Sequence, residues 1–301
     1  MLGESGLNFL LVFNPNAGAG RARRLLPGVE SGLQRFGRVT TLQTEAKGHA
    51  TSLVAESGLS EFDAIVAAGG DGTLFEVLNG LYRHEKGQRK PLGLVPVGTG
   101  NAFARDLGLL PGKWQQGVEL IGANRTEWVD VGRVTTQQTR FHFLNIVGAG
   151  LPVDAMKTAA HLKLLGNSAY SIATLWQALR LKSYPLRLVL DGEPLDRDSM
   201  FVEVSNTRYT GTTFLIAPAA KLDDGLLDVT LVSRLPRMRL LRLFPSIYSG
   251  QHVNYPEVMT RQVREIRIEA PQGLVLAPDG ELYGKSPATI TCLPRDLEIL
   301  C

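Results

Sequence analysis

Cysteine, long apolar runs and an excess of charge are all scarce in this chain of 301 residues. Its only two cysteines, Cys292 and Cys301, cannot form a disulfide scaffold and fit a reducing compartment. Apolar runs such as Leu10 to Phe13 fall far short of the roughly 18 residues that a membrane-spanning helix needs. The first ten residues include Glu4 and no basic residue, unlike a secretory signal. We therefore expect a cytoplasmic protein without a transmembrane span.

Several function classes lack their sequence signatures. The formal net charge is only +3, too small to indicate a nucleic-acid partner. The five histidines form no HExxH pattern or zinc spacing, and no G-x-S-x-G motif of a serine hydrolase is present. Apolar residues make up 44% and charged residues 20%, which is typical of a folded globular protein. At roughly 150 residues per domain, the length predicts about two domains.

The chain up to Trp128 alternates between apolar strands and helical stretches. Such alternation with short loops predicts βαβ units and a parallel sheet. The expected strands cover residues 7–13, 38–43, 63–68 and 92–95, and the expected helices cover 21–36, 50–57 and 73–82, with another beginning at 102.

After Trp128 the pattern changes to short strands separated by Asp-Gly turns, with helical inserts at about 153–182 and 236–249. This pattern favours an antiparallel sandwich or barrel. We expect an α/β domain over 1–130 and a mostly antiparallel β-sandwich domain over 131–301, whose last residues could pack back on the first domain. The expected strands cover 129–134, 141–147, 186–190, 201–205, 227–232, 263–268 and 274–277.

Three polar, glycine-rich loops follow predicted strands of the first domain, at residues 14–20, 69–73 and 96–101. Glycines at a strand-to-helix turn let the backbone approach a phosphate, and the helix that follows offers unpaired N–H donors. The first loop is not a Rossmann fingerprint, because Arg23 stands where the third glycine is required. A Walker P-loop ending at Gly284-Lys285-Ser286 also fails, because residue 279 is Asp. A single loop of this kind can be a plain tight turn, but three together predict a nucleotide-sized site.

Asp71 lies between glycines at the end of a predicted parallel strand, where open α/β sheets bind ligands. It could hold a phosphate-bound metal or orient a catalytic partner. The structural alternative is an N-cap for a helix starting at Thr73.

Four ordered motifs resemble the bacterial diacylglycerol kinase and sphingosine kinase family of lipid kinases. They are NPNAGAG, GGDGTLFEVLNGL, PVGTGNAFARDLG and a late PDGE, and they run from Asn14 to Glu281. The resemblance implies an α/β nucleotide domain, a C-terminal β-sandwich and an active site between the two.

The resemblance also implies residue roles. Asp279 would be the general base, with Asp71 and Glu281 also in the catalytic set. A magnesium ion would lie on main-chain oxygens and one carboxylate at Lys221, Asp224 and Leu226. The sequence departs from the family pattern at Phe75, where many members have Asn, and at Ala102, where many have Asp. The nucleotide contacts would be Asn14, Asn16, Thr44, Gly70, Asp71, Gly72, Thr73, Leu74, Phe75, Glu76, Thr99 and Asn101.

Phosphoryl transfer needs cradled phosphates, charge neutralisation by Mg²⁺ and an aligned acceptor hydroxyl. A carboxylate within hydrogen-bond reach of that hydroxyl can take its proton. Asp279 fits this role, although Asp279-Gly280 taken alone predicts only a hairpin turn. Asp224-Gly225 has the same structural alternative.

The segment 234–244 combines four arginines with Leu240, Leu241, Leu243 and Phe244. An apolar face flanked by basic groups suits an anionic membrane surface, whereas the alternative is a packed helix whose arginines point to water. The stretch from Lys157 to Arg187 is a similar candidate. We expect peripheral contact with the inner face of the membrane, a lipid substrate and no nucleic-acid partner; an exposed sheet edge leaves a homodimer open.

Together these features predict a lipid kinase that uses ATP and Mg²⁺ and phosphorylates a hydroxyl of a diacylglycerol-like or related lipid. An NAD kinase is one alternative, because NAD kinases also carry GGDGT. A catalytically silent, nucleotide-binding lipid sensor is another.

Overall fold

The computed structural model describes residues 6–110, 112–159, 169–180, 182–211, 213–270 and 273–301. The chain divides into two compact units, each described here by itself. Unit 1 comprises residues Met1–Val129 together with Arg295–Cys301, and unit 2 comprises Asp130–Pro294.

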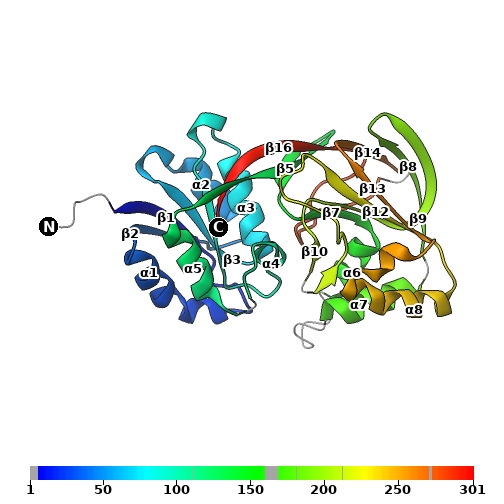
Figure 1. Cartoon of the computed structure of the whole chain (residues 1–301), viewed down its shortest axis with the longest axis horizontal. Helices are drawn as coiled ribbons and strands as arrows, with labels where there is room; N and C mark the ends of the chain where they lie inside the picture. Colours follow the sequence, from blue (N-terminus) through cyan, green and yellow to red (C-terminus); the bar gives the residue numbers. More distant parts are fainter. Residues whose placement is uncertain (1–5, 111, 160–168, 181, 212, 271–272) are drawn as a thin grey trace. The chain divides into compact units, whose positions relative to one another are not determined.

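Unit 1 is built on the parallel sheet that the strand–helix alternation predicts (Figure 1). Its strand order is β2-β1-β3-β4, and the last residues of β16 add a parallel strand beside β4, with Ile299 opposite Leu92. The strands are β1 (Leu7–Phe13), β2 (Gly37–Gln43), β3 (Ala64–Gly69), β4 (Leu92–Pro96) and β16 (Ala288–Leu300).

Helices cover both faces of this sheet. Helices α1 and α5 pack together on one face, and their buried residues join Phe9, Leu11 and Val66 in one core cluster. Helices α2 and α3 pack together on the other face. The helices are α1 (Leu26–Gln34), α2 (His49–Glu56), α3 (Asp71–Leu81), α4 (Ala102–Asp106) and α5 (Trp114–Ala123), with short 3₁₀ turns η1 (Arg21–Arg24), η2 (Leu59–Glu61) and η3 (Lys86–Gln88).

One predicted helix of unit 1 is wrong in its extent. Residues 21–36 form η1 and then α1, instead of one continuous helix. Pro27 lies in the first turn of α1. Proline lacks an N–H and has a φ suited to the first turn, so it begins a helix more readily than it continues one.

A polar cluster holds the end of β16 in unit 1. Asp296 accepts hydrogen bonds from the Tyr82 hydroxyl at 2.8 Å and from the Arg89 guanidinium at 3.1 Å, and it pairs with Lys86. The Arg89 guanidinium also lies 3.8 Å from the centre of the Tyr82 ring. These contacts attach the last residues of the chain to the segment that follows α3.

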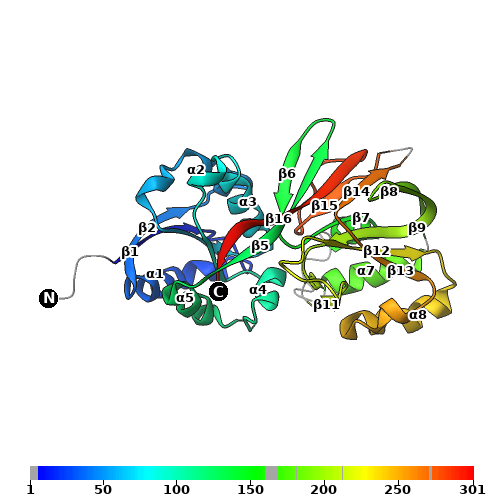
Figure 2. The same cartoon turned by 45° about the horizontal axis from the view of Figure 1, so that its top comes forward.

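Unit 2 is a largely antiparallel β-sandwich, as the Asp-Gly turns predict. Strand β9 organises it, because its first half pairs with β8 and its second half pairs with both β7 and β12 (Figure 2). The strands are β6 (Arg140–Phe143), β7 (Ile146–Gly150), β8 (Tyr184–Leu190), β9 (Glu193–Ser205), β10 (Tyr209–Thr210), β11 (Phe214–Leu215), β12 (Leu227–Ser233), β13 (Val258–Val263), β14 (Glu265–Glu269), β15 (Leu276–Pro278), the residues of β5 (Thr126–Thr136) from Asp130 onward and the first residues of β16.

A helical layer packs against this sandwich. Its elements are α6 (Leu151–Ala159), α7 (Ala169–Leu179), α8 (Arg237–Ser246), η5 (Ile247–Ser249) and η6 (Gln251–Asn254). Leu240, Leu243 and Phe244 of α8 are buried against Met200 and Phe214 in a second core cluster. The apolar spacing in 234–244 is therefore explained first by this packing.

Several strand predictions in unit 2 need correction. The segment 141–147 is not one strand, because β6 ends at Phe143 and β7 begins at Ile146. The segment 263–268 is not one strand, because Val263 ends β13 and β14 begins at Glu265. Strand β9 begins at Glu193 rather than at residue 201, since its first half is polar and mostly exposed. Strand β16 has no predicted counterpart.

Candidate functional site

The three glycine-rich loops of unit 1 lie at the carboxyl ends of parallel strands. Strand β1 lies between β2 and β3, so the connections after β1 and β3 leave the sheet where the strand order reverses. Ligands of open α/β sheets bind at such a switch point. The topology therefore places these loops where the sequence predicts a nucleotide site.

Glycines allow these loops to touch one another. A Cβ atom on Gly98 would lie 2.3 Å from the Cα of Gly70, a distance that real Cβ atoms do not tolerate. Gly18 has φ +60°, and a Cβ there would lie 2.9 Å from the carbonyl oxygen of Val97. The loops after β1, β3 and β4 thus meet through their backbones, which leaves backbone polar groups to line the site.

Asn14 ties the first loop to helix α3. Its side-chain amide donates to the Thr73 hydroxyl at 3.0 Å, and its side-chain oxygen accepts the backbone N–H of Asn16 at 2.9 Å. The N–H of Thr44 donates to the carbonyl oxygen of Phe13, so the loop after β2 begins beside the loop after β1. These four expected nucleotide contacts are therefore neighbours in unit 1.

Asp71 caps a helix other than the one expected. Helix α3 begins at Asp71 itself, with Gly70 as its N-cap, so an N-cap role for Asp71 on a helix starting at Thr73 is wrong. Its carboxylate instead accepts the backbone N–H groups of Ala102 at 3.0 Å and Phe103 at 3.3 Å, at the start of α4. The bond to Ala102 uses only the backbone, so the departure from Asp at this position does not affect it.

Glu76 caps the start of helix α2. Its two carboxylate oxygens accept the N–H groups of Gly48 at 2.7 Å and Ala50 at 3.1 Å, and its carbonyl oxygen accepts the Thr51 hydroxyl. A carboxylate at a helix N-terminus satisfies unpaired N–H donors and complements the helix dipole. Glu76 therefore orients the loop that follows Thr44.

The remaining nucleotide candidates differ in exposure. Thr99 is exposed, whereas the side chains of Leu74 and Phe75 are buried in the core. Asn101 has φ 52°, and its amide donates to the carbonyl oxygen of Gly98 at 2.9 Å. Its buried Oδ1 atom has no hydrogen-bond partner among the described residues, which leaves an acceptor available at this loop.

In unit 2, Asp279 is both a turn residue and a buried anion. Asp279 and Gly280 have φ values of 43° and 82°, which is the hairpin geometry that the dipeptide predicts. The Asp279 carboxylate is almost fully buried and accepts the N–H groups of Leu144 at 3.1 Å, Asn145 at 3.0 Å and Ile146 at 2.9 Å. The backbone between β6 and β7 thus fixes its position. The backbone of Glu281 closes the same turn by donating to the carbonyl oxygen of Pro278.

The turn implied as a magnesium site is supported by Asp130. Its carboxylate accepts the N–H of Gly225 at 2.6 Å, and its own N–H donates to the carbonyl oxygen of Leu222 at 2.6 Å. Asp224 is exposed and accepts the N–H of Leu226 at 3.0 Å. Burial and the nearby Asp224 carboxylate raise the pKa of Asp228 to about 6. The carboxylates of Asp130 and Asp224 at this turn suit a divalent cation.

The described residues contain no group of three His, Cys, Asp or Glu side chains that could hold a metal ion. A cation at this turn would therefore take main-chain oxygens from Lys221 and Leu226 together with the Asp224 carboxylate, as the resemblance implies. The residues present are compatible with that hard-oxygen ligand set.

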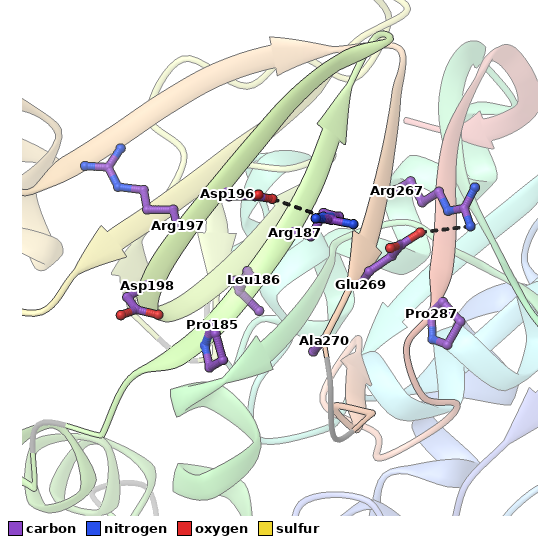
Figure 3. A pocket seen from close by; sticks show the side chains of 10 residues that line it. All are labelled: Pro185, Leu186, Arg187, Asp196, Arg197, Asp198, Arg267, Glu269, Ala270 and Pro287. Atoms are coloured by element: carbon purple, nitrogen blue, oxygen red, sulfur yellow. Dashed lines mark hydrogen bonds and ion pairs between the residues drawn. The ribbon is translucent and has the colours of Figure 1, made fainter.

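Another pocket lies on β8, β9 and β14 of unit 2 (Figure 3). It has a volume of about 780 Å³, and none of the expected site residues lines it. Its charges largely compensate one another, since Arg187 pairs with Asp196 and Arg267 pairs with Glu269. Its size is therefore not evidence for the reaction site.

The sequence did not single out Gly18, Gly98 or Asp130 as site residues. The sequence did contain a signal for Gly98, because this residue lies in the third glycine-rich loop, at residues 96–101. Asp130 had none, because its partners follow it by more than ninety residues.

Comparisons with known proteins agree with this organisation. Residues 8–134 match the family model described as the diacylglycerol kinase catalytic domain. Residues 145–301 match the model described as the YegS C-terminal NAD kinase beta sandwich-like domain.

Similar proteins span almost the whole chain. A diacylglycerol kinase of Mycobacterium tuberculosis is 33% identical over 95% of this chain and 93% of its own length. A diacylglycerol kinase of Staphylococcus haemolyticus is 32% identical over 96% of this chain and 86% of its own. A crystal structure of a diacylglycerol kinase from Bacillus anthracis covers 98% of this chain and 97% of its own, with a TM-score of 0.74 at 25% identity.

Proposed function

Since this chain belongs to the diacylglycerol kinase family, we propose that it is a lipid kinase that transfers the γ-phosphate of ATP to a hydroxyl of a diacylglycerol-like lipid. The observation that carries the proposal is the backbone contact of the three glycine-rich loops at the switch point of unit 1. Loops that meet in this way can approach phosphates closely. The relatives are named diacylglycerol kinases, and this name supports a diacylglycerol-like lipid as the acceptor of the phosphate.

The residues of unit 1 have separate tasks in this proposal. Gly70, Gly72 and the start of α3 offer backbone N–H groups to the phosphates, while Asn101 Oδ1 offers an acceptor to the nucleotide. Asp71 and Glu76 hold α4 and α2 in place around them. Magnesium, when bound, would neutralise charge that develops on the transferred phosphoryl group.

Asp279 is proposed as the general base that accepts the proton of the acceptor hydroxyl. Three backbone N–H groups fix the carboxylate, which keeps it in one orientation. A positioned carboxylate of this kind contributes about 10²- to 10⁴-fold to rate. Glu281, two residues farther along the same turn, is proposed to support the site.

The acceptor lipid would be met at a membrane surface. None of the helices in the described ranges is long and apolar enough to cross a membrane. Helix α8 exposes Met238 and Leu241 beside Arg237 and Arg242, and Trp176 of the adjoining α7 is 59% exposed. We call these five residues the apolar–basic face. It combines apolar contact with attraction for anionic lipid.

The membrane contact is tested by co-sedimentation with phosphatidylcholine vesicles with and without phosphatidylglycerol. Replacing Arg237 and Arg242 by Gln should weaken binding to the anionic vesicles about 30-fold, since each charge near the lipid contributes about 1 kcal/mol. Replacing Arg140 and Arg264, which are exposed and lie outside both candidate stretches, by Gln removes the same charge elsewhere and should leave binding unchanged. Equal losses in both variants would refute the assignment of this face.

The function itself is tested by transfer of labelled γ-phosphate from ATP, with Mg²⁺, to diacylglycerol in mixed micelles. NAD is included as a soluble acceptor. A labelled lipid supports the proposal, and labelled NADP would replace it by NAD kinase activity. ATP binding without any labelled product, across a panel of hydroxyl-bearing lipids, would favour the lipid-sensor alternative.

A further inference from the structure

Asn206 directly follows strand β9 and is only 1% exposed. Its place in the backbone is fixed from two sides, because Ser205 before it pairs with Ile146 of β7 and with Asp228 of β12. Its own N–H donates to the carbonyl oxygen of Asn145 at 2.7 Å. The surrounding backbone therefore holds the Asn206 side chain at one place in the interior of unit 2.

The side-chain amide of Asn206 joins two other segments. Its Nδ2 donates to the carbonyl oxygens of Asp130 and Leu144, each at 2.9 Å. The ladder between β5 and β6 reaches only as far as Gly132 opposite Phe143, so the amide connects the two strands just beyond it. A primary amide has two N–H hydrogens and can serve both carbonyls. The opposite orientation would set its oxygen against two carbonyl oxygens, so the contacts determine which atom points where.

The two bridged residues hold different parts of the proposed site. The Asp130 carboxylate accepts the N–H of Gly225 in the segment 221–226, which we call the cation turn. The N–H of Leu144 donates to the carboxylate of Asp279, the proposed general base. Hydrogen bonds thus run without a gap from the cation turn through Asp130, Asn206 and Leu144 to Asp279. All of these residues belong to unit 2.

We propose that Asn206 is a positioning residue that couples the cation turn to Asp279. An ordered turn fixes Asp130, Asn206 transmits this order to Leu144, and Leu144 holds the carboxylate of the base. The inference rests on the proposed roles of Asp279 and the cation turn, and it adds a residue that lies outside the four sequence motifs. An Asn206 that served only for stability would act equally with and without a cation, which makes the coupling testable.

The test measures amide hydrogen exchange at residues 144–146 of the full chain, with and without Mg²⁺ and without nucleotide or lipid. These three N–H groups donate to Asp279 and exchange when the segment opens locally. Mg²⁺ should slow their exchange about tenfold in the wild type, within the range of about 5- to 150-fold that coupled sites show. Asp224→Asn should remove this effect, because it removes the carboxylate of the cation turn. Exchange that does not respond to Mg²⁺ in the wild type would overturn the proposal.

Asn206→Ala should make exchange at residues 144–146 faster and insensitive to Mg²⁺. Thr207→Val is the matched control, because it removes a neighbouring buried hydrogen bond, from the Thr207 hydroxyl to Asn145 Oδ1, and leaves both bridged carbonyls paired. The control should lose stability and keep the response to Mg²⁺. A response that survives in Asn206→Ala, or one that is lost equally in Thr207→Val, would refute the assignment to Asn206. Should Asn206→Ala not fold, Asn206→Ser replaces it under the same criteria.

Kinetics supply a second readout. Asn206→Ala and Asp224→Asn should each lower kcat for lipid phosphorylation about tenfold and leave the KM for ATP within about threefold, because the proposed nucleotide contacts belong to unit 1. The double variant should also lose about tenfold, since both changes break the same connection and their effects are not additive. A loss of about a hundredfold in the double variant would show independent effects and contradict the coupling.

The two proposals can fail separately. Phosphate transfer by a wild-type chain whose exchange at 144–146 ignores Mg²⁺ would refute this inference alone. Exchange that responds to Mg²⁺ through Asn206, without any phosphate transfer, would refute the proposed function alone.

Discussion

Replacing Asp279 by Asn should separate the two tasks of this side chain. The wild-type carboxylate accepts three backbone N–H groups, two at Oδ1 from Asn145 and Ile146 and one at Oδ2 from Leu144. Asn keeps one oxygen, but its NH₂ group then faces an N–H donor. One hydrogen bond is lost, and the other two no longer have a charged acceptor. The free energy of unfolding should therefore fall by about 2 to 4 kcal/mol. The backbone adds little, because Asn tolerates the positive φ of this turn.

The effect of Asp279→Asn on the reaction should exceed its effect on folding. Loss of a general base lowers kcat by about 10²- to 10⁴-fold. The KM for ATP should stay within about threefold, because the proposed nucleotide contacts belong to unit 1. The assay measures lipid phosphorylation with saturating acceptor at a temperature well below the melting temperature of the variant, which is recorded in parallel.

Asp191 provides a matched control. It also precedes a glycine in a hairpin turn with a positive φ of 48°, and its carboxylate accepts the backbone N–H groups of Arg264 and Glu265. Asp191→Asn should cost stability but leave kcat within threefold. If folded Asp279→Asn keeps its kcat, the assignment of the base is refuted. If Asp191→Asn loses as much kcat, the loss reflects stability and not proton transfer.

Three further predictions concern the loops and the buried acids. Gly98→Ala should raise the KM for ATP at least tenfold with little change in the secondary structure seen by circular dichroism, because its Cβ would clash with Gly70. Glu76→Ala removes two helix-capping hydrogen bonds of α2 and should lower the free energy of unfolding by about 1 to 2 kcal/mol in urea titrations. The folded-state pKa values of Glu203 and Asp228 are raised to about 7 and 6. Their contribution to stability is therefore complete below about pH 4 and falls as pH rises toward 7; Glu203→Gln should remove about 3 kcal/mol of that fall.

The order of the elements followed from the sequence because their signals are local. Apolar strands that alternate with helical spacing predicted the parallel sheet of unit 1, and the Asp-Gly turns predicted the antiparallel sandwich of unit 2. The positive φ values at Asp191-Gly192 and Asp279-Gly280 show that the turn chemistry was correctly interpreted. Strand β16 was missed because its first half contributes to one unit and its end to the other, so no single periodic pattern covers it.

The partners of the site residues were not predictable in the same way. Asp130 and the turn at Gly225 are 95 residues apart, and Asp279 and Leu144 are 135 apart. A motif shows that a carboxylate is present but not which N–H groups it accepts. The structural alternative for Asp71 was a cap on its own helix, which is a local contact, whereas in the structure Asp71 lies in α3 and caps α4.

The GGDGTLFE motif at residues 69–76 connects the loops that surround it. Asp71 at the start of α3 caps α4, and Glu76, five residues later, caps α2. Thr73, between them, accepts the hydrogen bond from Asn14 of the first loop. One helical segment thus positions the loops after β1, β2 and β4, and the two acids do so through backbone N–H groups, which every residue except proline offers. The two acids are therefore needed for the geometry of the loops, whereas the side chain of Ala102 takes no part in the bond that its backbone N–H makes to Asp71.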